Sequence, residues 1–469
     1  MIRVSWRLLL LLAVSWSVHA ALPPPVAQAL AAGAIPDGSV GLYLHEVGAE
    51  KPLMTHAAER ALNPASTMKL VTTYAALELL GPAFTWTTEV HATGPIRNEV
   101  LDGSLVIKGA GDPKLTLENF WLLLRNLRAR GLREIRGDVL LDRSYFWTED
   151  YDPARFDGEP IRPYNTGPDA LLVNFKAITV QFVPEPDARG VRLVVEPRID
   201  AIQLVNHVTL TEGPCGDWVA KLKFEAQGNT DAARLVISGG YARECGERTR
   251  SFSLLSHRAY AAALFTQLWK DLGGTLTGAV RDGQAPGARL LAGARSPALS
   301  EVIRDINKFS NNVMARQLFL TLGAVGAGTP GTADKARAVI RQWLAQKGMP
   351  MPELAMENGS GLSRTERISA RSMGEMLLDA FRSPVMPEFI ASMPIVAADG
   401  TMRKRLKEAD IAGHAHIKGG TLNGVRAIAG YVLDARGRRV VVVFMVNHPN
   451  AGNAQAAQDA LLRWVYRRP

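Results

Sequence analysis

Three short segments, far apart in the sequence, hold residue types that could act together on a carbonyl group. The first segment, residues 63–69, reads NPASTMK. In a helix Ser66 and Lys69 would lie one turn apart on the same face, where the lysine could take the proton of the serine hydroxyl. A lysine acts as such a base only where burial and nearby cations lower its pKa. We therefore predict Ser66 as a nucleophile and Lys69 as its base.

Local signals around this segment predict a helix over residues 60–81. Asn63 is a good N-cap, and Pro64 is a favourable first helical residue. This would place Ser66 in the first turn, where backbone N–H groups can stabilise a developing oxyanion. The same pattern is also typical of a capped helix with an exposed lysine, and that alternative stays open.

The second segment reads SNN at residues 310–312, inside a stretch of helical pattern over 300–323. Ser310 and Asn312 could not face the same way in a regular helix, so we expect a helix end or a short loop there. Ser310 could then relay a proton, and Asn312 could hold both Lys69 and a substrate amide. A polar helix junction without a catalytic role is the alternative.

The third segment reads KGGT at residues 418–421. Lys418 offers a cation to a carboxylate, and Thr421 offers a hydroxyl and a backbone N–H group. Gly420 and its neighbour Gly419 let a ligand approach the backbone closely. On an edge strand these groups could bind a peptide C-terminus by strand addition, although a glycine-rich turn would read the same way.

The elements that must position these segments form an α/β (α+β) pattern. Strands at 39–47, 427–433 and 440–447, followed by a helix at 455–466, predict an antiparallel sheet flanked by helices. Further helices are expected at 332–347 and 369–382, and an extended proline spacer at 23–25. Between 86 and 282 the pattern changes to short strands, with helices only near 116–130 and 257–272, which indicates a large inserted β-rich region.

We divide the chain accordingly into three parts that follow a leader. Residues 21–85 and 283–469 are expected to form the catalytic domain. Residues 86–186 and 257–282 are expected to form the inserted β-rich domain, and residues 187–256 a small β domain nested within it.

Composition excludes several classes of protein. The chain has 469 residues, of which 47% are apolar, so it can bury large cores and is not disordered or collagen-like. It carries 54 basic and 45 acidic residues, a formal charge of +9. This moderate excess does not indicate a nucleic-acid partner.

The N-terminus is predicted to be a cleaved signal peptide, residues 1–20. Arg3 and Arg7 form a basic start, residues 8–14 are apolar, and residues 18–20 read VHA, a typical cleavage site. An uncleaved anchor is the alternative. No later stretch is apolar over about 18 residues, so no transmembrane segment is expected.

The two cysteines and two of the histidines have side chains that could act as metal ligands or reactive groups. In an oxidising compartment we expect Cys215 and Cys245 to form a disulfide, because neither lies in a CxxC motif or beside a suitable histidine. His414 and His416 could share one face of a strand, but no third ligand is evident nearby. No metal site and no organic cofactor are predicted.

Taken together and in this order, SxxK, SxN and KxG[T/S] resemble the penicillin-recognising serine enzymes. The gap of 244 residues between Ser66 and Ser310 is similar to that of the D-alanyl-D-alanine carboxypeptidase/endopeptidase family S13, the class C penicillin-binding protein 4 type. Segments at 109–113, 163–165, 358–364 and 399–405 also resemble motifs of that family. One departure is Gly419, where the family usually has threonine.

The resemblance implies a penicillin-binding/serine β-lactamase-like transpeptidase fold and a periplasmic serine DD-peptidase. Its substrates would be peptidoglycan peptides ending in D-Ala-D-Ala, and β-lactams would acylate Ser66. Arg364 and Asn174 lie in segments that resemble the cleft lining of the family, which implies contacts with the peptide stem.

Two other functions remain as alternatives: a β-lactamase, and a non-catalytic scaffold that binds peptidoglycan. The sequence leaves open the balance of carboxypeptidase to endopeptidase action, the preferred stem residue, the effect of Gly419 and any protein partner. A homodimer is also left open.

Overall fold

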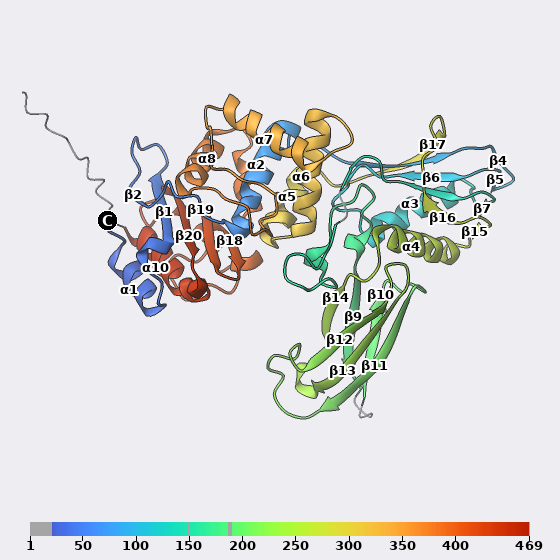
Figure 1. The fold of residues 1–469 in the computed structure, drawn as a ribbon, viewed down its shortest axis with the longest axis horizontal. Coiled ribbons are helices and arrows are strands. Elements are labelled where there is room, and N and C mark those ends of the chain that lie inside the picture. The colour runs from blue at the N-terminus through green and yellow to red at the C-terminus, as the bar shows by residue number, and fades with distance from the viewer. Residues whose placement is uncertain (1–20, 149–150, 186–189, 469) are drawn as a thin grey trace, which may run out of the picture.

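The computed structural model describes residues 21–148, 151–185 and 190–468, so the predicted signal peptide lies outside the described residues. Its central element is an antiparallel five-stranded sheet in the order β18-β19-β20-β1-β2 (Figure 1). The fold therefore has the antiparallel sheet that was predicted from the C-terminal hairpin. The strands of this sheet are β1 (Val40–Glu46), β2 (Met54–His56), β18 (Ala415–Leu422), β19 (Val425–Leu433) and β20 (Arg439–Asn447).

Helices cover both faces of this sheet because both faces of its central strands are apolar. In β20, Val441, Val443 and Met445 enter one core, whereas Val442 and Phe444 enter the other. Figure 1 shows the two groups of helices on opposite sides of the sheet. One group comprises α1 (Pro24–Ala32) and α10 (Gln455–Arg467). The other comprises α2 (Lys69–Leu80), α5 (Leu299–Lys308), α6 (Asn312–Ala327), α7 (Ala333–Gln346), α8 (Ala370–Arg382) and α9 (Met386–Ser392).

Two expectations about local structure were wrong. The predicted proline spacer is the start of α1, because the fixed φ of proline suits the first turn of a helix. The helix predicted from residue 60 begins only at Lys69, after a 3₁₀ turn, η2 (Ala65–Met68). Asn63 Oδ1 accepts a hydrogen bond from the backbone N–H of Ala65, and Ala65 has a φ of 46°, so the chain turns here before the helix forms.

The inserted region contains two sheets that pack with α3 (Leu117–Ala129) and α4 (His257–Asp271) around a second core, which continues into the outer sheets through residues such as Val180 and Leu235. Both helices were predicted from the sequence. One sheet has the order β16-β8-β6-β3-β17 and the other β15-β7-β5-β4. Their strands are β3 (Thr87–Ala92), β4 (Ile96–Arg97), β5 (Val100–Leu101), β6 (Leu105–Lys108), β7 (Glu134–Ile135), β8 (Val139–Asp142), β15 (Thr275–Leu276), β16 (Val280–Asp282) and β17 (Arg289–Arg295).

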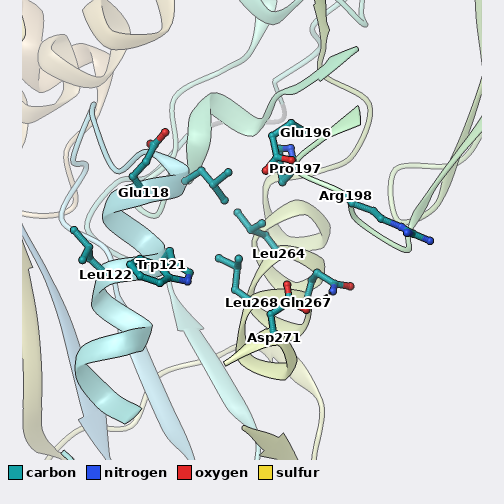
Figure 2. Close-up of a pocket in the computed structure, with 11 residues that line it drawn as sticks. Glu118, Trp121, Leu122, Glu196, Pro197, Arg198, Leu264, Gln267, Leu268 and Asp271 are labelled. Carbon is teal, nitrogen blue, oxygen red and sulfur yellow. Dashed lines mark hydrogen bonds between the residues drawn. The ribbon is translucent and has the colours of Figure 1, made fainter. Parts of the chain in front are cut away.

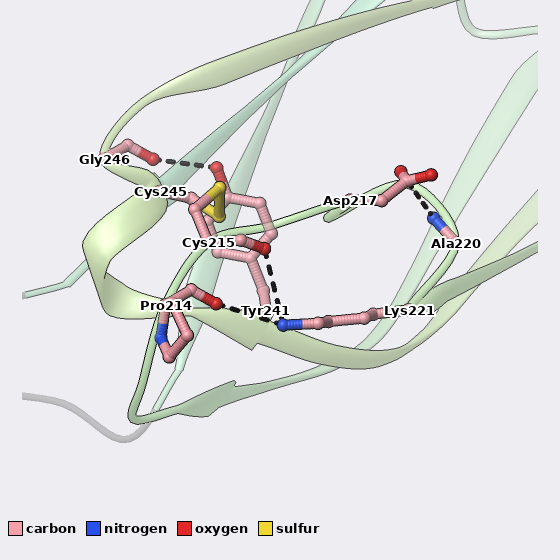
Figure 3. Close-up of a disulfide and its surroundings, with 8 residues drawn as sticks. All are labelled: Pro214, Cys215, Asp217, Ala220, Lys221, Tyr241, Cys245 and Gly246. Atoms are coloured by element: carbon pink, nitrogen blue, oxygen red, sulfur yellow. Dashed lines mark hydrogen bonds between the residues drawn. A yellow bond between two sulfur atoms is a disulfide. The ribbon is translucent and has the colours of Figure 1, made fainter.

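Two three-stranded sheets project from the inserted region, in the orders β10-β9-β14 and β11-β13-β12 (Figure 1). The predicted disulfide between Cys215 and Cys245 is present beside them. Figure 3 shows that the Tyr241 hydroxyl next to it donates to the Gly246 carbonyl, at 2.8 Å. The strands are β9 (Ile178–Pro184), β10 (Val191–Glu196), β11 (Ile202–Thr211), β12 (Leu222–Gly228), β13 (Ala233–Ala242) and β14 (Arg248–Phe252).

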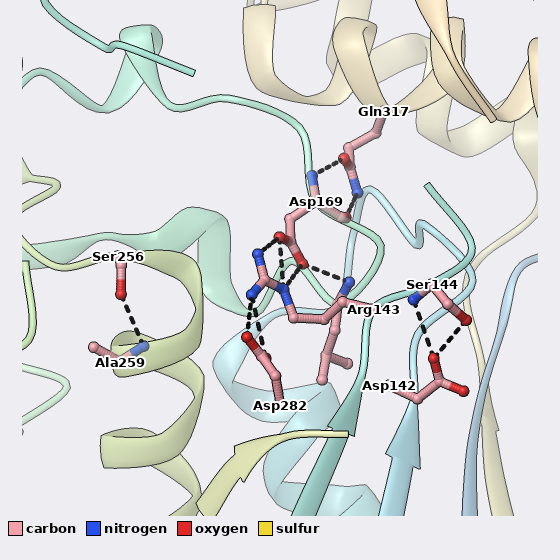
Figure 4. Close-up of polar contacts among 9 residues, drawn as sticks. Asp142, Arg143, Ser144, Asp169, Ser256, Ala259, Asp282 and Gln317 are labelled. Atoms are coloured by element: carbon pink, nitrogen blue, oxygen red, sulfur yellow. Dashed lines mark hydrogen bonds and ion pairs between the residues drawn. The ribbon is translucent and has the colours of Figure 1, made fainter. Parts of the chain in front are cut away.

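Helix α6 joins the inserted region to the catalytic part. Gln317 exchanges two hydrogen bonds of 2.8 Å with the backbone of Asp169, whose carboxylate is paired with Arg143 (Figure 4). The strand β17 pairs with β3, so the sheet of the inserted region continues beyond residue 282. We propose that this domain ends at Arg295 instead.

Seven short 3₁₀ helices complete the fold of residues 21–148, 151–185 and 190–468. Besides η2 they are η1 (Asp37–Ser39), η3 (Pro163–Asn165), η4 (Asn174–Lys176), η5 (Arg243–Cys245), η6 (Gly400–Met402) and η7 (Pro449–Ala454). Within the described parts of the chain, no helix combines the length and apolar character that crossing a bilayer requires.

Candidate active site

Ser66 and Lys69 face each other at the junction between η2 and α2. Lys69 Nζ lies 3.1 Å from Ser66 Oγ, within hydrogen-bonding distance. The Lys69 side chain is 0% exposed, whereas Ser66 is only partly buried and remains open to a ligand. The 3₁₀ turn thus achieves the one-turn spacing that an α-helix was predicted to provide.

Two further acceptors bond the Lys69 amine. Its Nζ donates to Asn312 Oδ1 at 2.6 Å and to the backbone carbonyl of Ser360. Burial lowers the pKa of Lys69 well below its usual value, and the positive charges of Lys418 and Arg316 lower it further. These surroundings favour the uncharged amine.

The segment that accepts from Lys69 is held in shape by a buried carboxylate. Glu366 Oε1 accepts hydrogen bonds from three successive backbone N–H groups, those of residues 357, 358 and 359, at 3.0–3.1 Å. The Asn358 side chain accepts from both the N–H and the hydroxyl of Ser360. Burial raises the pKa of Glu366, although the three N–H groups and Lys69 act in the opposite direction.

Ser310 and Lys418 form a second pair next to the first. Ser310 interrupts the helical stretch between α5 and α6 with a φ of 57°, at the break that the SxN spacing predicted. Its Oγ accepts a hydrogen bond of 2.8 Å from Lys418 Nζ, which also donates to the Gly419 carbonyl. Burial lowers the pKa of Lys418 to about 7. Phe309, just before Ser310, is 67% exposed at this edge.

Strand β18 brings the third segment against Ser66. A Cβ atom added to Gly420 would lie 2.7 Å from the Pro64 carbonyl and 2.9 Å from the Ser66 nitrogen, so only glycine allows this approach. Thr421, the next residue, is exposed, and its hydroxyl accepts from Arg426 at 3.0 Å. At Gly419 the added atom would meet nothing within 4 Å.

The two residues predicted to contact a peptide stem lie in different places. Arg364 donates to the carbonyl of Asn423, in the turn that follows β18, and stacks 4.6 Å from the Phe156 ring. It therefore borders the group described above. Asn174 is not brought to this group, because its side chain bonds the start of α3 and the hydroxyl of Tyr260.

The inserted region has a cavity of about 540 Å³ between α3 and α4 (Figure 2). It holds none of the residues of the three segments. Among the described residues, no group of three or more His, Cys, Asp or Glu side chains could hold a metal ion. The residues that line the cavity between α3 and α4 are Leu117, Glu118, Trp121, Leu122, Glu196, Pro197, Arg198, Leu264, Gln267, Leu268 and Asp271.

Comparison with known proteins identifies the family in which this arrangement of residues belongs. A model of the D-Ala-D-Ala carboxypeptidase 3 (S13) family matches residues 23–467. The chain belongs to this S13 family. The S13 chain is 25% identical over 426 residues to D-alanyl-D-alanine carboxypeptidase DacB of Haemophilus influenzae, covering 90% of this chain and 88% of the relative. It is 29% identical over 450 residues to a D-alanyl-D-alanine carboxypeptidase of Actinomadura sp. R39, covering 91% and 81%.

Solved structures are similar over nearly the whole S13 chain. The crystal structure of penicillin binding protein 4 from Haemophilus influenzae matches with a TM-score of 0.79 at 25% identity, covering 94% of this chain and 98% of that one. A structure of the same protein complexed with a β-lactam matches with a TM-score of 0.75. The fold is therefore the penicillin-binding fold that the motifs implied.

Sequence reasoning missed three contributors to the site of this S13 peptidase. Arg316 and Glu366 act on Lys69 by their charge, and the Ser360 carbonyl accepts from it. The segment 358–364 resembles a motif of the family, and this resemblance is the signal in the sequence that points to Ser360. Nothing in the local sequence around Arg316 or Glu366 indicates that either is buried.

Proposed function

We propose that this chain is a serine DD-peptidase that hydrolyses peptidoglycan peptides ending in D-Ala-D-Ala, with Ser66 as nucleophile. The observation that carries the proposal is the set of partners around Lys69. An uncharged amine has two N–H donors and one lone pair. Asn312 Oδ1 and the Ser360 carbonyl take both donors, which leaves the lone pair for the Ser66 hydroxyl 3.1 Å away.

Acylation follows from this geometry. Lys69 takes the hydroxyl proton as Ser66 Oγ attacks the carbonyl carbon of the penultimate D-Ala. The backbone N–H groups of Ser66 and Thr421 would stabilise the oxyanion, since β18 packs directly against the turn that carries Ser66. The proton on Lys69 then passes to the leaving amine with the help of Ser310, and water hydrolyses the acyl-enzyme.

Lys418 and Thr421 would bind the terminal carboxylate of the substrate. Two N–H groups of Lys418 bond the Ser310 hydroxyl and the Gly419 carbonyl, and the third remains for a ligand. With a pKa of about 7 Lys418 is only partly charged, and a carboxylate arriving beside it would raise that pKa and favour the cation. Asn312 would position the substrate amide, and Arg364 at the rim would contact the peptide stem.

The compartment of this reaction is proposed from two features. Residues 1–20 have the pattern of a signal peptide, and the disulfide between Cys215 and Cys245 suits an oxidising space such as the periplasm. N-terminal sequencing of the protein recovered from a periplasmic extract should begin at Ala21. A sequence beginning at Met1 would contradict cleavage.

Fluorescent penicillin tests the nucleophile. It should label the protein at one residue, found as Ser66 by peptide mass spectrometry, and Ser66→Ala should abolish the label. Ser104→Ala, in the inserted region, is the matched control and should label as the wild type does. Labelling that persists in Ser66→Ala would overturn the assignment.

Two further assays separate the alternatives. Mass spectrometry of muropeptide digests should show loss of one terminal alanine or splitting of cross-linked dimers, which reports carboxypeptidase and endopeptidase action separately. Rapid turnover of nitrocefin would indicate a β-lactamase instead. Binding to sacculi without any cleavage would indicate a scaffold.

A further inference from the structure

Arg316 lies on the catalytic face of α6 although the mechanism above does not use it. It follows Asn312 by four residues, so the two side chains lie on the same face of the helix. Asn312 Oδ1 bonds Lys69 Nζ at 2.6 Å, and Arg316 is 2% exposed. A guanidinium is thus buried one turn along the helix from the residue that holds the catalytic lysine.

The partners of Arg316 come from the inserted region and carry no full negative charge. Its Nη1 donates to the carbonyls of Thr166 and Tyr164, at 2.7 and 3.1 Å, and its guanidinium lies 5.5 Å from the Tyr151 ring centroid. Among the ion pairs of the described residues none includes Arg316. Its Nε is buried without a hydrogen-bond partner. No carboxylate of the described residues bonds this buried cation directly, so its charge is offset only at longer range, by Glu366 and Glu357, an arrangement that is costly to build.

Three charged groups surround Lys69, each from a different element. Lys418 on β18 and Arg316 on α6 lower the pKa of Lys69, and Glu366, in the segment before α8, raises it. Glu366 is 0% exposed, and its Oε2 is buried with no hydrogen-bond partner. Burial lowers the pKa of Arg316, and the charges of Tyr151, Glu366 and Glu357 act in the opposite direction. Arg316 and Glu366 therefore act on the lysine in opposite directions.

We propose that Arg316 and Glu366 are positioning residues of opposite charge that together set how readily Lys69 accepts a proton. The inserted region takes part in this control because its carbonyls at Tyr164 and Thr166 hold Arg316 in place. Neither residue touches the substrate in this scheme. The proposal rests on the proposed function, since it matters only if Lys69 is the base for Ser66.

The pH dependence of acylation tests this proposal. The second-order rate constant for labelling by fluorescent penicillin should be measured from pH 4.5 to 10 on the full-length mature protein. The rate rises as Lys69 loses its proton. Removing the cation in Arg316→Gln raises the pKa of Lys69, so the rising limb moves to higher pH. If the rising limb moves by one pH unit, the labelling rate at a given pH on that limb falls roughly tenfold. The rate on the plateau at high pH stays unchanged.

Two further variants complete the test. Arg316→Lys keeps the charge, and its rising limb should stay at the wild-type position even if the protein is less stable. Glu366→Gln keeps an oxygen for the three N–H groups and removes the negative charge, so its limb should move to lower pH. Lys418 is the same in all variants, so its titration does not produce differences between them.

The outcomes separate the two proposals. If wild-type protein is not labelled at Ser66, the proposed function fails. If it is labelled, but Arg316→Gln and Glu366→Gln only scale the rate equally at every pH, the residues are merely structural and this inference is overturned. If Arg316→Gln does not fold, Glu366→Gln decides: an unmoved limb overturns the inference, and a limb at lower pH supports it.

Discussion

The central sheet of the catalytic part and the outer sheet β11-β13-β12 are stabilised in different ways. In β20 all residues except the first and last are buried, whereas in β12 only Leu222 is fully buried. The outer sheet instead has a disulfide beside it, between Cys215 and Cys245. Packing on both faces thus holds the sheet that carries the candidate site, whereas the outer sheet combines packing on one side of β13, through Leu235 and Ile237, with a covalent link.

This difference matters for the site because its groups come from four separate elements. Ser66 on η2, Asn312 on α6, Ser360 in a loop and Lys418 on β18 meet only if the layers pack closely. In close-packed layers a change in side-chain volume of even one methylene group lowers stability, whereas a half-exposed sheet tolerates such a change. We therefore expect the same kind of substitution to lower the free energy of unfolding more in the central sheet than in the outer sheet.

The largest effect is expected from truncating a core aromatic residue. Phe444 is 0% exposed in β20, and Phe444→Ala should lower the free energy of unfolding by about 3–5 kcal/mol. Phe224 in β12 is only partly buried, and its ring faces Arg250, so Phe224→Ala should cost about 1 kcal/mol. Urea unfolding with hydrogen exchange, read on peptides from β20 and β12 separately, measures both. Equal losses would refute the comparison.

The second effect concerns the disulfide and should be confined to the outer sheets. Replacing both cysteines by serine opens a loop of about 30 residues, which in the chain-entropy model costs about 3–4 kcal/mol. Hydrogen exchange should speed up in β11, β12 and β13. The rate of penicillin labelling at Ser66 should match the wild type, and a parallel loss of labelling would show that the two regions are not separable.

Much of the fold could be predicted from the sequence because it depends on local signals. The two C-terminal strands are apolar runs separated by a turn at residues 435–438, and they appear as β19 and β20. Thr332 was the expected start of a helix, and it caps α7 by accepting from the N–H of Lys335. The helix break at Ser310 followed from the spacing of Ser310 and Asn312.

The rest could not be predicted because it depends on contacts between distant residues. Whether Arg316 and Glu366 are surface charges or buried ones is decided by segments at 151–166 and 357–359 that pack on them. The Ser360 carbonyl carries no signal at all, since every residue has one. The proline run at 23–25 suits both an extended spacer and the first turn of a helix, and the packing of α1 against α10 selects the helix.

A smaller loss than that of Phe444→Ala or of the disulfide, yet the most direct test of the site, is expected from two adjacent glycines in β18. In Gly420→Ala the added methyl group would lie 2.7 Å from the Pro64 carbonyl and 2.9 Å from the Ser66 nitrogen, so β18 and the turn that carries Ser66 must move apart. A misplacement of about 1 Å costs on the order of 10²-fold in rate, equal to about 2.7 kcal/mol. The rate of fluorescent penicillin labelling measures this loss.

Gly419→Ala is the matched control, because its methyl group would meet nothing within 4 Å. It should label within about threefold of the wild type, and so should Gly419→Thr, which restores the residue usual in the family. If Gly420→Ala labels as fast as Gly419→Ala, β18 does not press against Ser66, and the catalytic region tolerates added volume as the outer sheet does. If Gly420→Ala alone is slow and both proteins unfold at the same temperature, the loss comes from the position of Ser66 and not from stability.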